Sequence, residues 1–274
     1  MPLSVVEAAI LGAVQGLTEF LPVSSSGHLA LAQHFLGVTE PSITFDVFLH
    51  FATLLAVFIF FWKDIFKLRL QDYLKIGVAS IPAVFVGLVF KDQLEQLFSS
   101  PLLVACALLF TAALMFVADN MLQRAALDPA TVSKDETKGD VKEIGLAAVS
   151  FKQACIIGIF QAVAITPGVS RSGSTVAAGI FSKVRREAAF RFSFLMSIPV
   201  ILGASLVQGL ESVQAGLTDV YPAQFLVGGV LAFSFGLASL GVFKLVIKNA
   251  RLRIFGWYAG SVGMVTIISL LFFS

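Results

Sequence analysis

Six long stretches of the chain consist almost entirely of apolar residues, mainly Leu, Phe, Val, Ala and Gly. They are residues 45–62, 75–90, 101–118, 192–210, 222–243 and 254–273. A membrane-spanning helix needs about 20 such residues. A single segment in lipid must also satisfy its own backbone hydrogen bonds, which favours a helix. The pattern therefore predicts an all-α integral membrane protein with six transmembrane helices.

Two further apolar regions, 4–37 and 152–182, are interrupted at their centres by polar residues. The first contains Glu19 and a run of Pro, Ser, Gly and His at 22–28, and the second contains a run of Pro, Gly, Ser and Arg at 167–173. Irregular backbone is tolerated at membrane depth only where protein or a water-filled cavity surrounds it. We therefore expect two re-entrant helical hairpins, each made of two short helices joined by a polar tip.

The two hairpins match each other at a constant offset of 146 residues. Ser24, Ser26 and Gly27 align with Ser170, Ser172 and Gly173. This repeat predicts a single membrane domain, 1–274, with one unit at 1–119, a cytoplasmic linker at 120–147 and a second unit at 148–274. Each unit holds a hairpin and three spans. Because three is odd, the second unit is inverted relative to the first, an architecture that brings broken helices together at the membrane midplane.

Composition and charge exclude other classes of protein. The hydrophobic share of 57%, the charged share of 13% and the mean hydropathy of +0.91 leave too little polar surface for a soluble enzyme. A formal net charge of +2 argues against a nucleic-acid-binding protein. The two cysteines, Cys106 and Cys155, lie far apart in apolar runs, and we interpret both as inert core residues.

The positions of the cations predict the orientation in the membrane. Seventeen of the 19 Lys and Arg residues lie in four segments. These segments lie on one face of the membrane if each hairpin leaves the membrane on the side from which it entered. These segments are 63–75, 120–152, 183–191 and 244–253. The positive-inside rule makes that face cytoplasmic, so both termini are expected outside.

Arg171, at the second tip, is the only Lys or Arg that this layout leaves inside an apolar region. An intramembrane charge costs at least about 2.5–3.5 kcal/mol and is by default functional. Because its guanidinium matches phosphate oxygens in a fork, Arg171 is expected to bind a phosphate. The alternative is a structural ion pair with Glu19. Hydroxyls and backbone N–H groups around the tips are expected to help hold the anion, at Ser24, Ser26, Gly27, Ser170, Ser172, Gly173 and Thr175.

The first tip offers groups for metal binding and proton transfer. Gln15 and Glu19 lie one helical turn apart and could hold a divalent cation, Mg²⁺ or Ca²⁺, through oxygen ligands. His28 is a candidate general base or acid, and with Ser25 and a nearby carboxylate it follows the logic of an activated nucleophile. His34 and His50 are interpreted as core residues.

Ser25 is the predicted nucleophile because it breaks the repeat. At the offset of 146 its counterpart is Arg171, whereas Ser24 and Ser26 have serine counterparts. Paired tips would bring Ser25 and Arg171 to one phosphate from opposite sides. The competing mechanism is attack by a metal-bound water.

These motifs resemble those of the bacitracin-resistance undecaprenyl-diphosphate phosphatase family. That family shows a (Glu/Gln)xxxGlu motif, met here at Gln15 and Glu19, and a ProGlyxSerArgSerxxThr motif, met at 167–174 and Thr175. The resemblance covers essentially the whole chain. It implies hydrolysis of the C55 isoprenoid diphosphate to the carrier monophosphate, with Glu19, Ser25, His28 and Arg171 in the active site and a divalent cation. Many members have Glu where this chain has Gln15.

The resemblance also implies a place and partners. It places the chain in a bacterial plasma (inner) membrane as a multi-pass protein whose active site opens to the external side. The partners are then an isoprenoid diphosphate lipid and membrane lipid, with no nucleic acid; a homodimer is left open. The alternative function is a transporter or flippase for an anionic isoprenoid lipid or another anion, since inverted repeats are typical of transporters.

Overall fold

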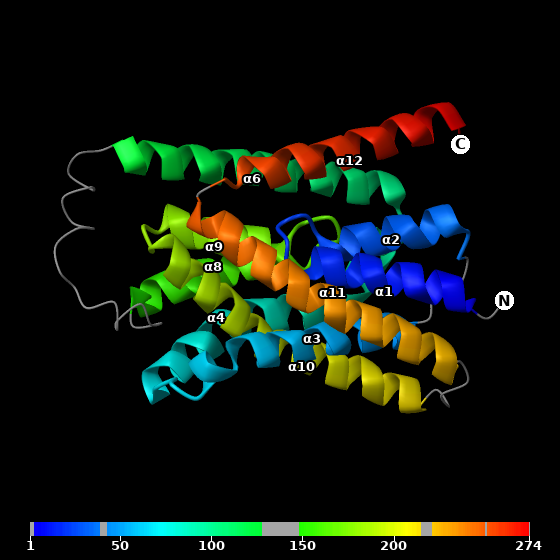
Figure 1. Ribbon diagram of the computed structural model, residues 1–274, viewed down its shortest axis with the longest axis horizontal. Coiled ribbons are helices and arrows are strands. Elements are labelled where there is room, and N and C mark those ends of the chain that lie inside the picture. The colour runs from blue at the N-terminus through cyan, green and yellow to red at the C-terminus, as the bar shows by residue number, and fades with distance from the viewer. Residues whose placement is uncertain (1–2, 39–42, 128–147, 215–220, 250, 274) are drawn as a thin grey trace.

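The computed structural model describes residues 3–38, 43–127, 148–214, 221–249 and 251–273, and every regular element within them is a helix (Figure 1). Six of these helices are long and apolar enough to cross a membrane, which confirms the six predicted spans. They are α3 (Ile43–Ile65), α4 (Leu70–Val89), α6 (Pro101–Leu127), α10 (Arg186–Gln214), α11 (Pro222–Lys248) and α12 (Arg253–Phe273).

Several helices extend beyond their apolar stretches. Because α4 begins at Leu70, before its apolar stretch, Lys75 of the cation-rich segment 63–75 lies inside a helix, where it is buried and its Nζ lies 3.9 Å from Asp72 Oδ1. The salt-bridge partner three residues earlier explains how a cation is accommodated there. Similarly, α6 continues to Leu127 and takes up the start of the expected linker, whose remainder at 128–147 lies outside the described residues.

Four shorter helices form two hairpins. In the first, α1 (Val5–Glu19) packs against α2 (Ser25–Leu36), and in the second α8 (Phe151–Val163) packs against α9 (Arg171–Phe181). Both hairpins start with the same capping box. A serine hydroxyl accepts a hydrogen bond from the backbone N–H three residues later, and the acidic or amide side chain of that residue accepts one from the serine N–H. The two caps, Ser4 and Ser150, are again 146 residues apart. A short helix, α5 (Lys91–Phe98), connects α4 to α6.

The helix pairings are those expected of two related units. α1 packs against α11, and its counterpart α8 packs against α4. Glycines make both contacts close, because a Cβ on Gly12 would lie 2.3 Å from the Gly228 carbonyl oxygen and one on Gly158 would lie 2.4 Å from that of Ala79. Two helices of the first unit pack against their own counterparts in the second unit, α3 against α10 and α6 against α12 (Figure 1). The packing is compatible with the inverted repeat.

Phenylalanine side chains fill the core beside the tips. Phe20 at the end of α1 meets Phe194 of α10 edge to face at 5.7 Å, and Phe194 also packs against Phe61 and Phe190. The two cysteines are not part of such a core, since both are exposed. That interpretation was wrong because spans carry apolar side chains on their outer as well as their inner face.

Candidate active site

The two hairpin tips are built by the same hydrogen bonds. Ser24 caps α2 by accepting from the Gly27 N–H at 3.3 Å, and Ser170 caps α9 by accepting from the Gly173 N–H at 3.1 Å. In each tip the capping hydroxyl lies 3.3 Å from the hydroxyl two residues later. Ser24 also has a positive φ of 71°, which is a strained backbone conformation for a residue other than glycine.

The tips contact each other reciprocally. A Cβ on Gly27 would lie 2.9 Å from the Gly168 Cα, and a Cβ on Gly173 would lie 3.1 Å from the Pro22 Cβ. Position 168 is the counterpart of 22, and 173 is the counterpart of 27, so the same contact occurs twice with the partners exchanged. Such exchange is the signature of a two-fold relation. It brings the N-termini of α2 and α9 to one place.

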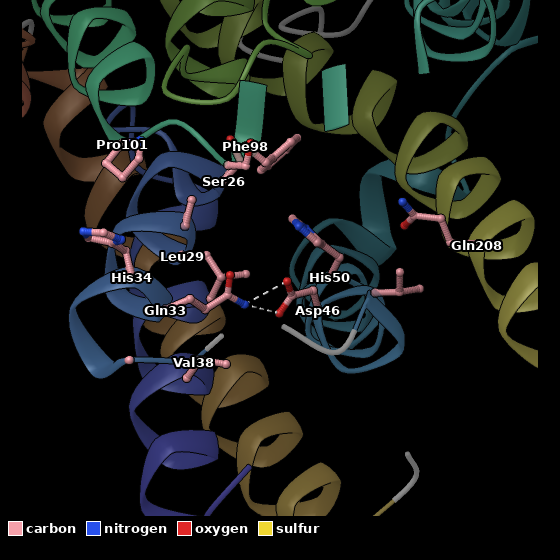
Figure 2. Close-up of a pocket in the computed structure, with 14 residues that line it drawn as sticks. Ser26, Leu29, Gln33, His34, Val38, Asp46, His50, Phe98, Pro101 and Gln208 are labelled. Atoms are coloured by element: carbon pink, nitrogen blue, oxygen red, sulfur yellow. Dashed lines mark hydrogen bonds between the residues drawn. The ribbon is translucent and has the colours of Figure 1, made fainter. Parts of the chain in front are cut away.

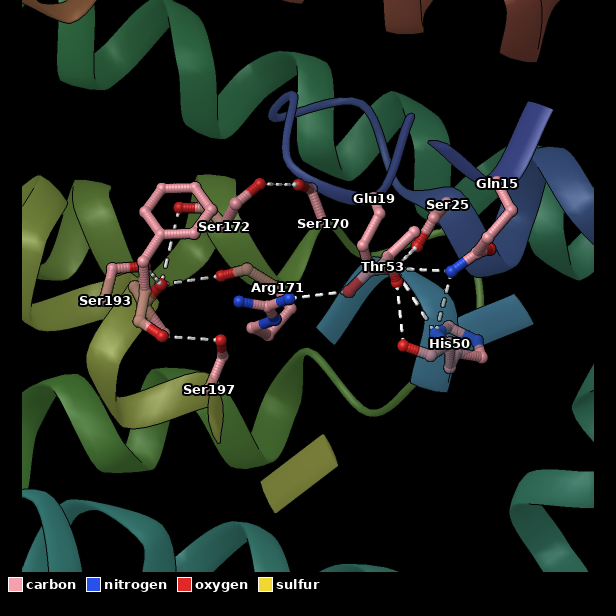
Figure 3. Close-up of polar contacts among 12 residues, drawn as sticks. Gln15, Glu19, Ser25, His50, Thr53, Ser170, Arg171, Ser172, Ser193 and Ser197 are labelled. Carbon is pink, nitrogen blue, oxygen red and sulfur yellow. Dashed lines mark hydrogen bonds and ion pairs between the residues drawn. The ribbon is translucent and has the colours of Figure 1, made fainter. Parts of the chain in front are cut away.

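Glu19 is the centre of a polar cluster between the tips (Figure 3). It is 6% exposed, and its Oε1 accepts from Arg171 Nη2 at 2.6 Å. Its Oε2 accepts from Ser25 Oγ at 2.6 Å and from Gln15 Nε2 at 3.0 Å. The structure therefore joins four of the residues that the sequence singled out.

Arg171 forms the ion pair with Glu19 and still keeps donors for another group. Its second terminal nitrogen, Nη1, is buried and has no hydrogen-bond partner among the described residues. A buried donor left unpaired costs about 1–3 kcal/mol, and more for a charged group. The guanidinium is thus placed to receive an anionic oxygen between the tips.

His50 belongs to this cluster, and the interpretation of His50 as a core residue was wrong. Its Nδ1 lies 3.4 Å from Glu19 Oε2 and 2.9 Å from Gln15 Nε2. The sequence repeat could have indicated a role for His50, because the units differ there: the matched pair Phe48-Leu49 and Phe194-Leu195 is followed by His50 in one unit and Met196 in the other. His34, also interpreted as core, is exposed and packs against the ring of Phe35.

His28 forms its hydrogen bonds with groups other than the Ser25 hydroxyl. Its Nδ1 lies 2.8 Å from the Ser24 carbonyl oxygen, and its Nε2 lies 3.1 Å from the Tyr258 hydroxyl of α12. In the described part of the chain no hydrogen bond joins His28 to Ser25, whose hydroxyl donates to Glu19 instead. The expected serine–histidine pair is therefore not formed in this structure.

The remaining tip residues hold the second tip in place. On α6, the Thr111 hydroxyl donates to the Gly168 carbonyl at 2.8 Å and accepts from the Ser170 N–H at 3.0 Å. Ser172 donates to the Leu21 carbonyl at 3.1 Å, which links the two tips. Thr175 donates to the Arg171 carbonyl at 2.8 Å and so lies behind the cluster.

A cavity of about 600 Å³ leads to the cluster (Figure 2). Ser26 and His50 line it, together with apolar side chains such as Leu29 and Phe98. On its wall Asp46 accepts two hydrogen bonds from Gln33 Nε2, both 2.9 Å long. Small solutes can therefore reach His50 and the first tip through the cavity.

The residues proposed for a cation offer few but suitable oxygen atoms. No group of three His, Cys, Asp or Glu side chains converges within the described residues. Gln15 Oε1, however, is buried and has no hydrogen-bond partner among them. Because Mg²⁺ is commonly bound by one or two protein oxygens plus substrate phosphates and water, Glu19 and Gln15 fit such an ion.

Comparison with known proteins gives a consistent result. Residues 8–265 match the protein family described as bacitracin resistance protein BacA. The undecaprenyl-diphosphatase of Methanosphaera stadtmanae is 37% identical over 97% of this chain and 98% of the relative. Those of Alkaliphilus metalliredigens and Methanococcus maripaludis are 37% and 38% identical, over 96% and 92% of this chain and 97% and 95% of the relatives.

Proposed function

We propose that this chain, which belongs to the bacitracin resistance protein BacA family, is an undecaprenyl-diphosphate phosphatase. It hydrolyses undecaprenyl diphosphate to undecaprenyl phosphate and inorganic phosphate. This reaction recycles the carrier lipid for cell-wall synthesis and confers bacitracin resistance.

The observation that carries the proposal is the cluster between the tips. It combines a buried arginine with an unpaired donor, Arg171, and a serine hydroxyl, Ser25, that donates to a buried carboxylate, Glu19. The N-termini of α2 and α9 lie at the same place, and helix N-termini attract phosphate. A diphosphate bound there would have an electrostatic clamp on one side and a nucleophile on the other.

In the proposed reaction Ser25 Oγ attacks the terminal phosphorus atom of the diphosphate. The Ser25–phosphorus bond forms, the bridging P–O bond breaks, and undecaprenyl phosphate leaves while the hydroxyl proton passes to Glu19 Oε2, 2.6 Å away. Water then attacks the phosphorus atom of the phosphoserine and the Ser25–phosphorus bond breaks. One water proton passes to Ser25 Oγ, inorganic phosphate is released, and Glu19 gives up the proton it accepted to solvent. Arg171 stabilises the charge that develops on the phosphate oxygens. Ser24, Ser26, Gly27, Ser170, Ser172, Gly173 and Thr175 form the frame around the phosphates.

His28 remains a predicted active-site residue. To exchange a proton with Ser25 or with the attacking water, its Nε2 would have to leave the Tyr258 hydroxyl, 3.1 Å away. The bond between Nδ1 and the Ser24 carbonyl ties the ring to the residue that precedes Ser25. We therefore propose that His28 takes part in proton transfer only after bound substrate has broken its hydrogen bond with the Tyr258 hydroxyl.

A divalent cation, Mg²⁺ or Ca²⁺, is proposed to bind to Glu19 and to the unpartnered Oε1 of Gln15. When bound, it neutralises charge on the phosphate oxygens of the substrate. Because Gln15 is neutral, the two residues together contribute one negative charge.

The chain is a multi-pass membrane protein, and we propose that its site opens to the external side of a bacterial plasma membrane. In Figure 1 both termini lie at the end of the molecule opposite to the end of α6 at Leu127. The cavity is lined at that same end by residues from the end of α2, the start of α3 and the far part of α10. Since the Lys-rich linker follows α6, the positive-inside rule puts the cavity outside.

Phosphate release by the purified protein tests the proposal. Undecaprenyl or farnesyl diphosphate is expected to yield inorganic phosphate, and a chelator is expected to abolish the release. The two-fold tip contact also suits a transporter of an anionic lipid. Lipid movement across vesicles without phosphate release would favour that alternative and contradict the phosphatase assignment.

A further inference from the structure

His50 stands at a corner of a triangle of potential metal-ligand positions. The distance from Gln15 Nε2 to Glu19 Oε2 is 3.0 Å, that from Gln15 Nε2 to His50 Nδ1 is 2.9 Å, and that from His50 Nδ1 to Glu19 Oε2 is 3.4 Å. Adjacent ligands of an octahedral ion with bonds of about 2.1 Å lie about 3.0 Å apart. The three atoms therefore have the spacing of one face of an octahedron.

The amide of Gln15 can supply the oxygen that this face requires. Its Oε1 is buried and without a partner among the described residues, while its Nε2 occupies the corner between Glu19 and His50. The terminal torsion of a glutamine is broad and roughly two-fold. Half a turn about it exchanges the two atoms, so that Oε1 faces an ion in place of Nε2.

The second repeat unit lacks this arrangement and provides an internal comparison. Gln161, the counterpart of Gln15, is 1% exposed, and neither of its amide atoms has a hydrogen-bond partner among the described residues. The counterparts of Glu19 and His50, however, are Ile165 and Met196. Only the first unit combines the amide with a carboxylate and an imidazole.

We propose that His50 is a third protein ligand of the divalent cation, beside Glu19 and Gln15, and that the chain prefers a first-row transition metal such as Mn²⁺ to Ca²⁺. The proposal rests on the phosphatase assignment and specifies its metal site. Imidazole suits transition metals, whereas Ca²⁺ takes oxygen ligands.

The surroundings of His50 suit an ion that enters from the cavity. His50 lines the cavity wall, so an ion can reach it without passing the tips (Figure 2). Asp46 lies one helical turn earlier on the same face of α3, and its carboxylate attracts cations to this wall. Arg171 binds the other oxygen of Glu19, Oε1, so the ion would share Oε2 with the Ser25 hydroxyl, which lies 2.6 Å from it.

Mn²⁺ binding to the purified full-length protein tests the proposal independently of hydrolysis. Pulsed electron paramagnetic resonance of the bound Mn²⁺ is expected to show coupling to an imidazole nitrogen. In His50→Gln this coupling should disappear and the Mn²⁺ affinity should fall by about tenfold or more, while the Ca²⁺ affinity changes much less. His34→Gln is the matched control, because His34 lines the same cavity away from Glu19 and should keep both the coupling and the affinity.

A second variant guards against a folding defect. His50→Asp keeps a metal ligand and should bind Mn²⁺ without the nitrogen coupling. Absence of Mn²⁺ binding in the wild-type protein, absence of nitrogen coupling there, or coupling that persists in His50→Gln would overturn the proposal. A wild-type protein that binds Mn²⁺ through His50 but releases no phosphate would instead contradict the phosphatase assignment.

Discussion

Glu19 divides its two carboxylate oxygens between different partners. One oxygen accepts only from Arg171 among the hydrogen bonds described for it, and the other faces Ser25, Gln15 and His50. The buried ion pair positions the arginine, and the hydroxyl contact positions the nucleophile. The same carboxylate thus links the proposed clamp of one hairpin to the proposed nucleophile of the other.

Replacement of Arg171 tests the clamp. We expect Arg171→Ala to lower the rate of phosphate release by about 10²–10³, because it removes a group that stabilises transition-state charge. Arg171→Lys should also be impaired, since it keeps the charge but loses the planar fork. Steady-state assays of protein that unfolds at the wild-type temperature check both, and unchanged hydrolysis in Arg171→Ala would leave Arg171 as a structural ion pair.

Sequence could predict the polar residues that break an apolar pattern, but not all of their partners. Arg171 and Glu19 stand out because charge is costly in a membrane, and the structure joins them directly. His50 lies inside an otherwise ordinary span, so its sequence surroundings hint at a role only through the mismatch with Met196 in the repeat, and its contact with Glu19 identifies that role. The orientation of His28 toward Tyr258, 230 positions away, depends on packing between units that no local pattern encodes.

At the scale of helices, two glycines set how closely the hairpins approach the spans. A Cβ on Gly12 or Gly158 would lie within 2.4 Å of a backbone carbonyl oxygen of α11 or α4, respectively. Backbone atoms cannot yield as a flexible side chain can. The helices would therefore have to move apart.

Gly12→Ala and Gly158→Ala are each expected to lower stability by about 1–3 kcal/mol, as overpacking does in well-packed interiors. Gly77→Ala is the matched control, because Gly77 lies in α4 and a Cβ added to it would meet no atom within 4 Å. Its added methyl should be neutral or slightly stabilising through helix propensity. Thermal unfolding in detergent checks all three, and equal behaviour of Gly12→Ala and Gly77→Ala would contradict the close α1–α11 contact.

The extent of the helices was harder to predict than their number. Hydrophobicity located all six spans, but α10 runs from Arg186 although its apolar stretch begins near 192. Charged first turns are tolerated at helix ends outside the apolar region, so hydropathy alone underestimates length. The short amphipathic helix α5 was missed because it is too short and too polar to register as a span.

At the scale of the whole molecule, the repeat was visible in the sequence because the tips need particular residues. Capping serines and close-approach glycines recur at the offset of 146, and the structure gives each pair the same hydrogen bond or contact. The reciprocal contact of Pro22 with Gly173 and of Gly168 with Gly27 then follows from a two-fold relation. The chemistry lies where the repeat differs.

The orientation in the membrane can be tested with single cysteines. In a background that lacks Cys106 and Cys155, cysteines at the termini should react with an impermeant thiol reagent in intact cells. Cysteines at positions 67, 138 and 186 should be protected, because the Lys- and Arg-rich segments are predicted to lie inside. Labelling at position 138 without labelling at the termini would reverse the predicted sidedness.

The most direct test of the central claim, that the two tips form one centre for diphosphate hydrolysis, is to trap the phosphorylated enzyme. Acid quenching during turnover of a diphosphate labelled at its terminal phosphate should leave the label on Ser25 of the wild-type protein and none on Ser25→Ala, which should be inactive. Ser24→Ala and Ser26→Ala, which alter the tip frame, should still be labelled. Near-normal activity in Ser25→Ala with sharp loss in Ser24→Ala or Ser26→Ala would contradict the account.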